Sequence, residues 1–312
     1  MRGCSCRGTA GFAHVSCLAE QAKVLCVEGE ENNLSPKGRW ERWNTCSLCE
    51  QSYHGIVACA LGWACWKMYL GRPETDNPRL GAMSMLGNGL AHADHHEEAL
   101  PVQKALLSLH QRLGDSENIL VVQSNLAITY EALRRHEEAI PMKRDVYFGR
   151  LRLNGEEAVE TLITANNYAT SLARRQRYKE AKTLMRKTMP VARRVLGENC
   201  ETTLKMRMIY ARALYHDTGA TPEDQREAMM TLEETERIVR RVLGGAHPLT
   251  LTIERDLQMP RAVLRAQAWA LSNAEVERLP PAEKRAVTAL RAVGLELAQQ
   301  RGLEDIVEHL SL

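Results

Sequence analysis

The sequence is poor in aromatic side chains, which make up 5% of the chain and include only two phenylalanines. It also lacks an excess of charge of either sign, because 41 Lys and Arg residues accompany 39 Asp and Glu residues, for a net charge of +2. Composition therefore indicates neither a nucleic-acid nor an acidic-substrate partner. The abundance of Ala, Leu, Glu and Arg favours helix.

Long hydrophobic runs are also missing. The longest, GIVACALGWACW from Gly55 to Trp66, is well short of the roughly 20 residues that cross a bilayer. The first residues contain no apolar run of the ~7–15 residues that a secretory signal needs. We therefore expect no membrane span and a cytoplasmic location, with the nucleus as the alternative. Cysteines are kept reduced there, so closely spaced ones are better explained as metal ligands than as disulfides.

Cysteine is almost absent after residue 70, where Cys200 stands alone. The other eight are Cys4, Cys6, Cys17, Cys26, Cys46, Cys49, Cys59 and Cys65. This asymmetry predicts a small cysteine-rich module followed by a long region of different character.

From about residue 79 the sequence repeats. The segment NLAITYEALRRHEEAI, 125–140, aligns with NYATSLARRQRYKEAK, 167–182, at a spacing of 42, and with MLGNGLAHADHHEEAL, 85–100, at a spacing of 40. The connectors recur as well, with Gly155 and Gly197 separated by 42 residues and Gly197 and Gly244 by 47. The five extra residues fall in HDTGATPEDQ, which predicts a lengthened turn.

Each unit is predicted to form two helices. Leu126, Ala127 and Tyr130 share one face of the first helix, as do Tyr168, Ala169 and Leu172 in the next copy, because positions three or four apart lie on one side of a helix. The predicted core positions of the second helices are Ala139, Met142, Val146 and Leu153, and then Ala181, Leu184, Thr188 and Val195. A pair of helices cannot bury both faces, so the copies must stack.

These residues resemble the tetratricopeptide repeat in its kinesin-light-chain-like form of about 42 residues. Leu126, Ala127, Tyr130 and Ala139 occupy the family's large, small, aromatic and small positions, and LGGAHPLTL is similar to its connector. The resemblance implies an α-superhelix whose concave surface binds a protein or peptide partner.

The first cysteines have the spacing of metal ligands: Cys4-x-Cys6, seven residues, His14-x2-Cys17, 28 residues, then Cys46-x2-Cys49. This order resembles the second half of a RING-CH (RING-variant) zinc finger, a small α+β module. The neighbouring residues CRGT, H-x-x-C-L and W-x-x-C-x-L-C agree with that family.

In the family, alternate ligand pairs share a metal. The resemblance therefore implies one complete zinc site formed by Cys4, Cys6, Cys46 and Cys49, a tetrahedral set of thiolates. His14 and Cys17 would share a second ion with an earlier C-x2-C pair that is absent ahead of Cys4. The second site is half missing, so the module looks truncated at its front.

RING-CH modules are typically ubiquitin-ligase domains that dock a ubiquitin-conjugating enzyme and contain no catalytic nucleophile. Here the loop of the first metal site is absent, and Gln21 stands where the family favours Trp. Both departures weaken the expectation of ligase activity, and no catalytic residue is predicted. Zinc in such a module stabilises the fold and does no chemistry. Cys26, Cys59 and Cys65 are interpreted as packed thiols.

Two other clusters have simpler explanations. His92 and His96 have a metal-capable spacing, but their segment aligns with a turn between repeat helices, where acids in the first helical turn complement the helix dipole. Arginine pairs recur at 134–135, 174–175, 193–194 and 240–241. The last two pairs lie near predicted second-helix ends, where cations are favourable.

We therefore predict a mainly α protein with a partial RING-CH-type zinc finger at 1–52, a joining helix and loop at 53–78, about four helix-pair repeats at 79–275 and capping helices at 276–312. Its predicted function is that of a zinc-binding interaction adaptor linked to ubiquitin transfer. One alternative is an active RING-type ubiquitin ligase that docks a conjugating enzyme and recruits substrate through its repeats. The other is a structural scaffold with a vestigial finger.

Overall fold

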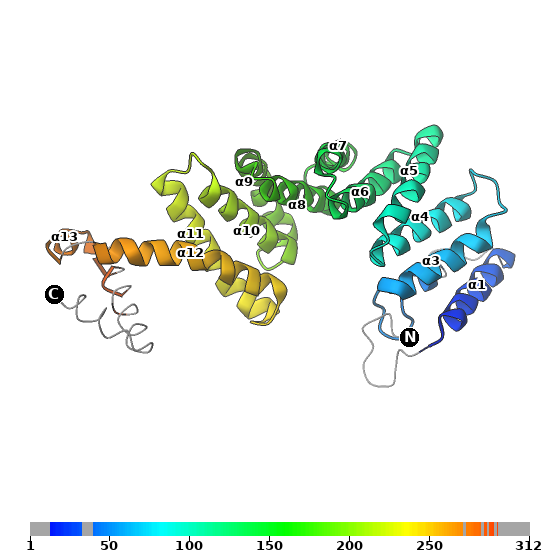
Figure 1. Ribbon diagram of the computed structural model, residues 1–312, viewed down its shortest axis with the longest axis horizontal. Coiled ribbons are helices and arrows are strands. Elements are labelled where there is room, and N and C mark those ends of the chain that lie inside the picture. Colours follow the sequence, from blue (N-terminus) through cyan, green and yellow to red (C-terminus); the bar gives the residue numbers. More distant parts are fainter. Residues whose placement is uncertain are drawn as a thin grey trace. The chain divides into compact units, whose positions relative to one another are not determined.

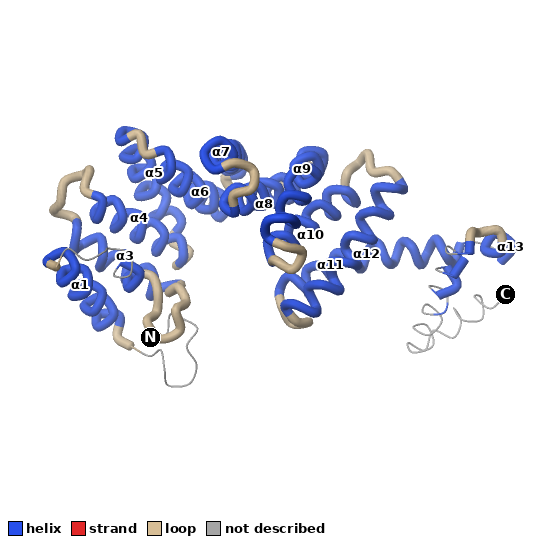
Figure 2. Tube along the Cα trace, turned by 180° about the vertical axis from the view of Figure 1, so that it is seen from behind, coloured by secondary structure: helices blue, strands red, loops and turns tan. Residues whose placement is uncertain are grey.

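The computed structural model of the chain describes residues 13–32, 40–270, 273–281, 284–285, 287–289 and 292. These residues form helices joined by loops (Figure 2), with one isolated antiparallel bridge between Thr45 and Ser52. None of the described helices is long and apolar enough to cross a membrane. The helices, shown in Figure 1, are α1 (Val15–Glu31), η1 (Glu41–Trp43), α3 (Gly55–Tyr69), α4 (Asn77–His92), α5 (His96–Leu113), α6 (Ser116–Ala132), α7 (His136–Asn154), α8 (Val159–Arg174), α9 (Tyr178–Leu196), α10 (Glu201–His216), α11 (Pro222–Leu243), α12 (Pro248–Ala270) and α13 (Asn273–Glu277).

The chain divides into two compact units, residues 1–168 and 169–312. In the first unit, α4 packs against α5, α5 against α6 and α6 against α7, and in the second unit α9 packs against α10, α10 against α11 and α11 against α12. Packing between sequence neighbours is the arrangement expected of stacked repeats.

A short turn of the same geometry joins the helices of each of three pairs. Three residues separate α4 from α5, α6 from α7 and α8 from α9. The middle residues, Asp94, Arg134 and Gln176, have φ values of 62°, 59° and 60°. The next N–H in each turn donates to the carbonyl five residues earlier, as from Arg135 to Tyr130 at 2.8 Å, which closes a helix end in the Schellman manner. The turns recur at 40 and 42 residues, so the predicted period is confirmed.

The connectors between pairs begin with glycines for a conformational reason. Gly155, Gly197 and Gly244 follow the last residues of α7, α9 and α11 and have φ values of 82°, 86° and 87°. Side chains with a Cβ rarely adopt this backbone conformation. The lengthened turn is also confirmed, because α10 ends at His216 and α11 begins at Pro222. Thr221 caps α11 through a reciprocal capping box with Asp224.

The predicted core of the helix pairs is largely confirmed. Leu126, Ala127 and Tyr130 are buried. The small position of the second helices is fully enclosed, and its members are Ala99, Ala139, Ala181 and Ala228.

Two predicted core residues are exposed instead. Leu153 is 56% exposed and Val195 is 37% exposed. They lie in the last turns of α7 and α9, where most residues face solvent. Extrapolating the helical period to the end of each helix was therefore wrong, because the last turn has few neighbours to pack against.

The predicted α+β finger is not shown. The described residues of segment 1–52 form α1, η1 and the turn around the Thr45–Ser52 bridge, with no strand. A hairpin has no room to extend, because η1 ends at Trp43 and α3 begins at Gly55. Cys4 and Cys6 lie outside the described residues.

The N-terminal helices share one core with the start of the repeats. Trp43, Leu61 and Tyr69 have no exposed surface and cluster with Ala22 of α1 and Ala82 of α4. The ring of Trp40 stacks on Tyr69 with centroids 5.3 Å apart. At the other end, α13 spans the predicted boundary between the repeats and the capping helices, and most of residues 276–312 lie outside the described part of the chain.

Candidate functional site

The first helices of successive pairs in the second unit line a groove of about 600 Å³. The groove residues of each helix lie three or four positions apart, on one face. The last turn of α8 contributes Thr170, Ala173 and Arg174; α10 contributes Met208, Ile209, Arg212 and His216; and α12 contributes Thr252, Arg255 and Asp256. Gln176 and Tyr178 complete the lining.

The groove has an apolar floor and basic walls. Met208 and Ile209 are 8% and 3% exposed, whereas Arg174 and Arg255 are exposed. Arg212 binds Asp256 through two of its nitrogens: Nε donates to Oδ2, and Nη2 donates to Oδ1 at 2.8 Å. No carboxylate among the described residues pairs with Arg174 or Arg255. Three guanidinium groups therefore face one carboxylate, and two positive charges remain uncompensated.

The Arg212–Asp256 ion pair occupies a position that is neutral in the first unit. There, Asn125 Nδ2 of α6 donates to Asn88 Oδ1 of α4 at 3.0 Å. The repeat spacing aligns Asn88 with Arg212 and Asn125 with Asp256. The contact between the first helices of neighbouring pairs is thus an amide pair in the first unit and an ion pair in the second. The aligned surfaces of the two units therefore differ in their charged groups.

Two of the groove residues, Tyr178 and His216, form a stacked ring pair. Their rings are 5.6 Å apart at 28°. An adjoining recess of about 490 Å³ shares these two residues and is also lined by Arg177 and Lys179. Arg177 is held by Glu180, with Nε 2.6 Å from Oε1. Lys179 is the other cation that lines this recess, and it has no carboxylate partner among the described residues.

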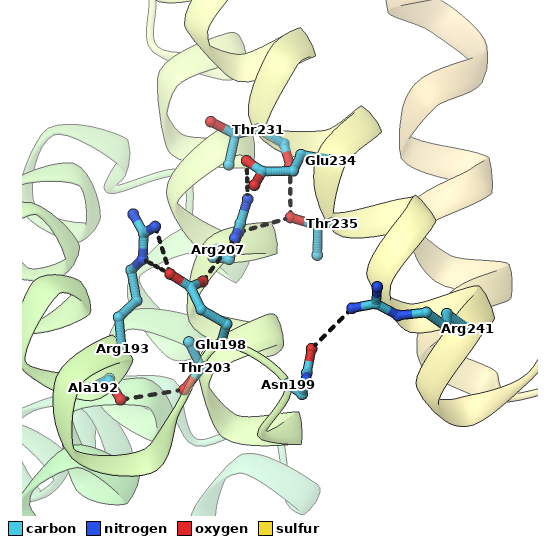
Figure 3. Close-up of polar contacts among 10 residues, drawn as sticks. All are labelled: Ala192, Arg193, Glu198, Asn199, Thr203, Arg207, Thr231, Glu234, Thr235 and Arg241. Carbon is cyan, nitrogen blue, oxygen red and sulfur yellow. Dashed lines mark hydrogen bonds and ion pairs between the residues drawn. The ribbon is translucent and has the colours of Figure 1, made fainter.

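A buried arginine fixes α10 against its neighbours (Figure 3). Arg207 is 3% exposed, and its Nη1 lies 3.1 Å from Glu198 Oε2 in the connector ahead of α10. Its Nε donates to Thr235 Oγ1 at 3.1 Å, and Nη2 contacts Glu234 of α11. Because α10 also carries the groove floor, this network positions the binding surface.

The predicted metal ligands are only partly described. Cys46 and Cys49 lie on one tight turn, in which Cys46 N–H donates to Gln51 O and Glu50 N–H donates to Cys46 O, both at 2.9 Å. Glu50 adopts φ 54° to close the turn. His14 Nδ1 lies 3.9 Å from Cys17 Sγ. Among the residues that the structure describes, no three His, Cys, Asp or Glu side chains converge as a metal site.

The groove was not predicted from the sequence. The pair 174–175 stood out only as one of several arginine pairs, and Arg212 and Arg255 carried no signal of their own. The repeat period aligns Arg212 with Asn88 and Asp256 with Asn125, but only the structure shows that these aligned positions are in contact. The histidine segment 92–98 does form the predicted turn, with His96 Nε2 3.6 Å from Asp94 and His95 Nδ1 3.7 Å from Glu98.

Comparison with protein families supports the repeats. Residues 79–147 and residues 161–199 each match a tetratricopeptide repeat model. Comparison with curated protein sequences finds no match.

Two solved structures have a similar fold over most of this chain. The crystal structure of nearly identical TPR-like repeats from a putative kinesin light chain of Podosopora anserina is 18% identical, with a TM-score of 0.52 over 74% of this chain and 98% of that chain. The crystal structure of BtubC (BKLC) from P. vanneervenii is 15% identical, with a TM-score of 0.53 over 76% of this chain and 95% of that chain. The chain therefore contains tetratricopeptide repeats and shares the fold of kinesin-light-chain-type repeat arrays.

Proposed function

We propose that this protein is an interaction adaptor that binds an acidic peptide segment of a partner protein in the groove formed by α8, α10 and α12. The observation that carries the proposal is the pair of uncompensated cations, Arg174 and Arg255, above the apolar floor of Met208 and Ile209. Binding sites for extended ligands typically combine an apolar surface with a few placed polar groups.

Each feature of the groove has a role in this proposal. Met208 and Ile209 would bury apolar parts of the bound segment. Arg174 and Arg255 would form charge-assisted hydrogen bonds with its acidic groups, which are stronger than neutral hydrogen bonds. Asp256 holds Arg212 through two nitrogens, so that Arg212 shapes the wall instead of moving toward the ligand. Rim charges of this kind favour a partner of opposite sign and repel basic segments.

The test is peptide binding by the full chain. A labelled library of acidic peptides should bind, and binding should weaken as salt rises because exposed charges are screened. Arg174→Glu together with Arg255→Glu should abolish it. Arg175→Glu provides the matched control, because Arg175 is the exposed neighbour of Arg174 and does not line the groove. Equal loss in the control, or binding that does not respond to salt, would contradict the proposal.

We also propose that Cys46 and Cys49 supply half of a zinc site that Cys4 and Cys6 complete, in a protein of the reducing cytoplasm. The tight turn supports this, because two thiols three residues apart can bind one ion from one turn. When bound, zinc would clamp the N-terminal segment to the turn and add stability. His14 and Cys17 are the weaker candidates, since they form only half of a site.

Metal content tests this second proposal. Elemental analysis of the full chain should give one zinc, and Cys46→Ser should lower that value toward zero. Cys200→Ser is the matched control, because Cys200 is distant in sequence from every proposed ligand. Cobalt substitution would give a second readout through thiolate absorption. One zinc that survives Cys46→Ser would contradict the assignment.

Ubiquitin transfer is the remaining proposal, and it rests on the sequence resemblance and on the zinc site. The active ligase would dock a conjugating enzyme at the N-terminal segment and recruit its substrate through the groove. Autoubiquitination with a panel of conjugating enzymes tests this, with chains expected for the unaltered chain and lost on Cys46→Ser. Failure with every enzyme favours an adaptor or scaffold without ligase activity.

A further inference from the structure

We infer that the acidic group recognised in the groove of α8, α10 and α12 is a phosphoryl group on a serine or threonine side chain of the partner peptide. This inference rests on the proposed function and names its ligand class. The groove presents two arginines without carboxylate partners, Arg174 and Arg255, beside an arginine that is already neutralised, Arg212.

The charge balance favours phosphate over a single carboxylate. A phosphorylated side chain carries about −1.5 to −2 charges at neutral pH, which matches the two uncompensated guanidinium groups. One Asp or Glu side chain supplies a single charge and would leave one of the two arginines unpaired. Three phosphate oxygens can also accept hydrogen bonds from more than one guanidinium group, which is the common mode of phosphopeptide recognition by arginine clusters.

The residues around the two arginines fit the rest of such a ligand. Met208 and Ile209 form an apolar floor on which the methylene or methyl group of the modified side chain can pack. His216 lines the groove and is held by stacking on Tyr178, with ring centroids 5.6 Å apart. Asp256 is the one carboxylate among the described residues that line the groove, and Arg212 already binds it.

Three degenerate peptide libraries test the inference on the full chain. They carry phosphothreonine, glutamate or threonine at one fixed central position within otherwise equal mixtures. We expect the phosphothreonine library to bind about tenfold more tightly than the glutamate library, which corresponds to one additional charge-assisted contact. The threonine library should bind more weakly still.

Substitutions in the groove test whether its arginines cause the preference for phosphothreonine. Arg174→Ala and Arg255→Ala should each remove most of the difference between the phosphothreonine and glutamate libraries. Arg175→Ala should leave it within about twofold, which is below the effect of one lost contact. Circular dichroism of each variant confirms that the helices are retained. If Arg174→Ala fails to fold, Arg174→Gln keeps a polar, helix-compatible side chain without charge and makes the same test.

The outcomes separate this inference from the proposed function. Equal binding of the phosphothreonine and glutamate libraries would overturn the phosphoryl inference and leave acidic-peptide binding intact. Binding of none of the three libraries would overturn both. A phosphothreonine preference that persists when both Arg174 and Arg255 are replaced would place phosphate recognition elsewhere and overturn the assignment to this groove.

Discussion

Arg207 is the least exposed charged side chain in the described part of the chain, at 3%. Its partners Glu198 and Glu234 are 44% and 53% exposed, so solvent can rehydrate them when the arginine is removed. Arg207→Met should therefore lower the free energy of unfolding by about 2–3 kcal/mol, which is at or below the lower end of the range for a broken buried ion pair.

Urea denaturation measures this loss. Arg193→Met is the matched control, because Arg193 also binds Glu198 but is 47% exposed, and exposed pairs contribute about 0–1 kcal/mol. If both variants cost the same, the buried position of Arg207 would have no special role in holding α10 against α11.

The stability of the first unit should depend on pH through the carboxyl group of Asp115. Its carboxylate accepts hydrogen bonds from the Asn118 side chain and backbone at the start of α6, and these bonds, with the nearby His110, lower its pKa below the usual value. A lowered folded pKa gives stability that is present above the unfolded value, near 4, and is lost as the pH falls through the folded value.

Asp115→Ala should therefore cost about 1 kcal/mol at pH 7, the usual value of an N-cap, and progressively less below about pH 4. Asp115→Asn should keep most of the cap and remove its titration. Urea midpoints between pH 3 and pH 7 compare the three chains. A cost for Asp115→Ala that does not change with pH would contradict this account.

At the scale of elements, α3 and α4 approach so closely that glycine is required at their crossing. A Cβ on Gly62 would lie 2.7 Å from Met85 O, and one on Gly89 would lie 2.6 Å from Ala58 O. Both obstacles are backbone atoms, which cannot move aside without shifting a helix.

Gly62→Ala and Gly89→Ala should each destabilise the first unit by about 2–3 kcal/mol, because overpacking outweighs the higher helix propensity of Ala. Gly71→Ala is the control, since a Cβ there meets nothing within 4 Å. Thermal denaturation is the measurement. Stabilisation of Gly62→Ala relative to the unaltered chain would show that the two helices are not this close.

At the scale of the whole molecule, packing between sequence neighbours predicts that damage stays local. Hydrogen exchange of Gly89→Ala should therefore rise in α3 and α4 while α10 and α11 keep most of their protection. Exchange that rises equally in all helices would show that the chain opens as a single cooperative body.

Much of the repeat region could be predicted from the sequence because the same residue types recur at a fixed spacing. Gly155, Gly197 and Gly244 predicted the connectors, and Ala139 and Ala181 predicted the small positions. Leu153 and Val195 could not be placed, because burial at a helix end depends on whether another element covers it.

The sequence by itself determined the helical repeats, their period and the connectors between pairs, because glycine at positive φ and small residues at crossings are local requirements that recur from copy to copy. Only the tertiary structure decided where charge accumulates. Arg174, Arg212 and Arg255 are separated by about forty residues each and share no local motif, and they line one groove because stacking brings the same face of successive first helices together.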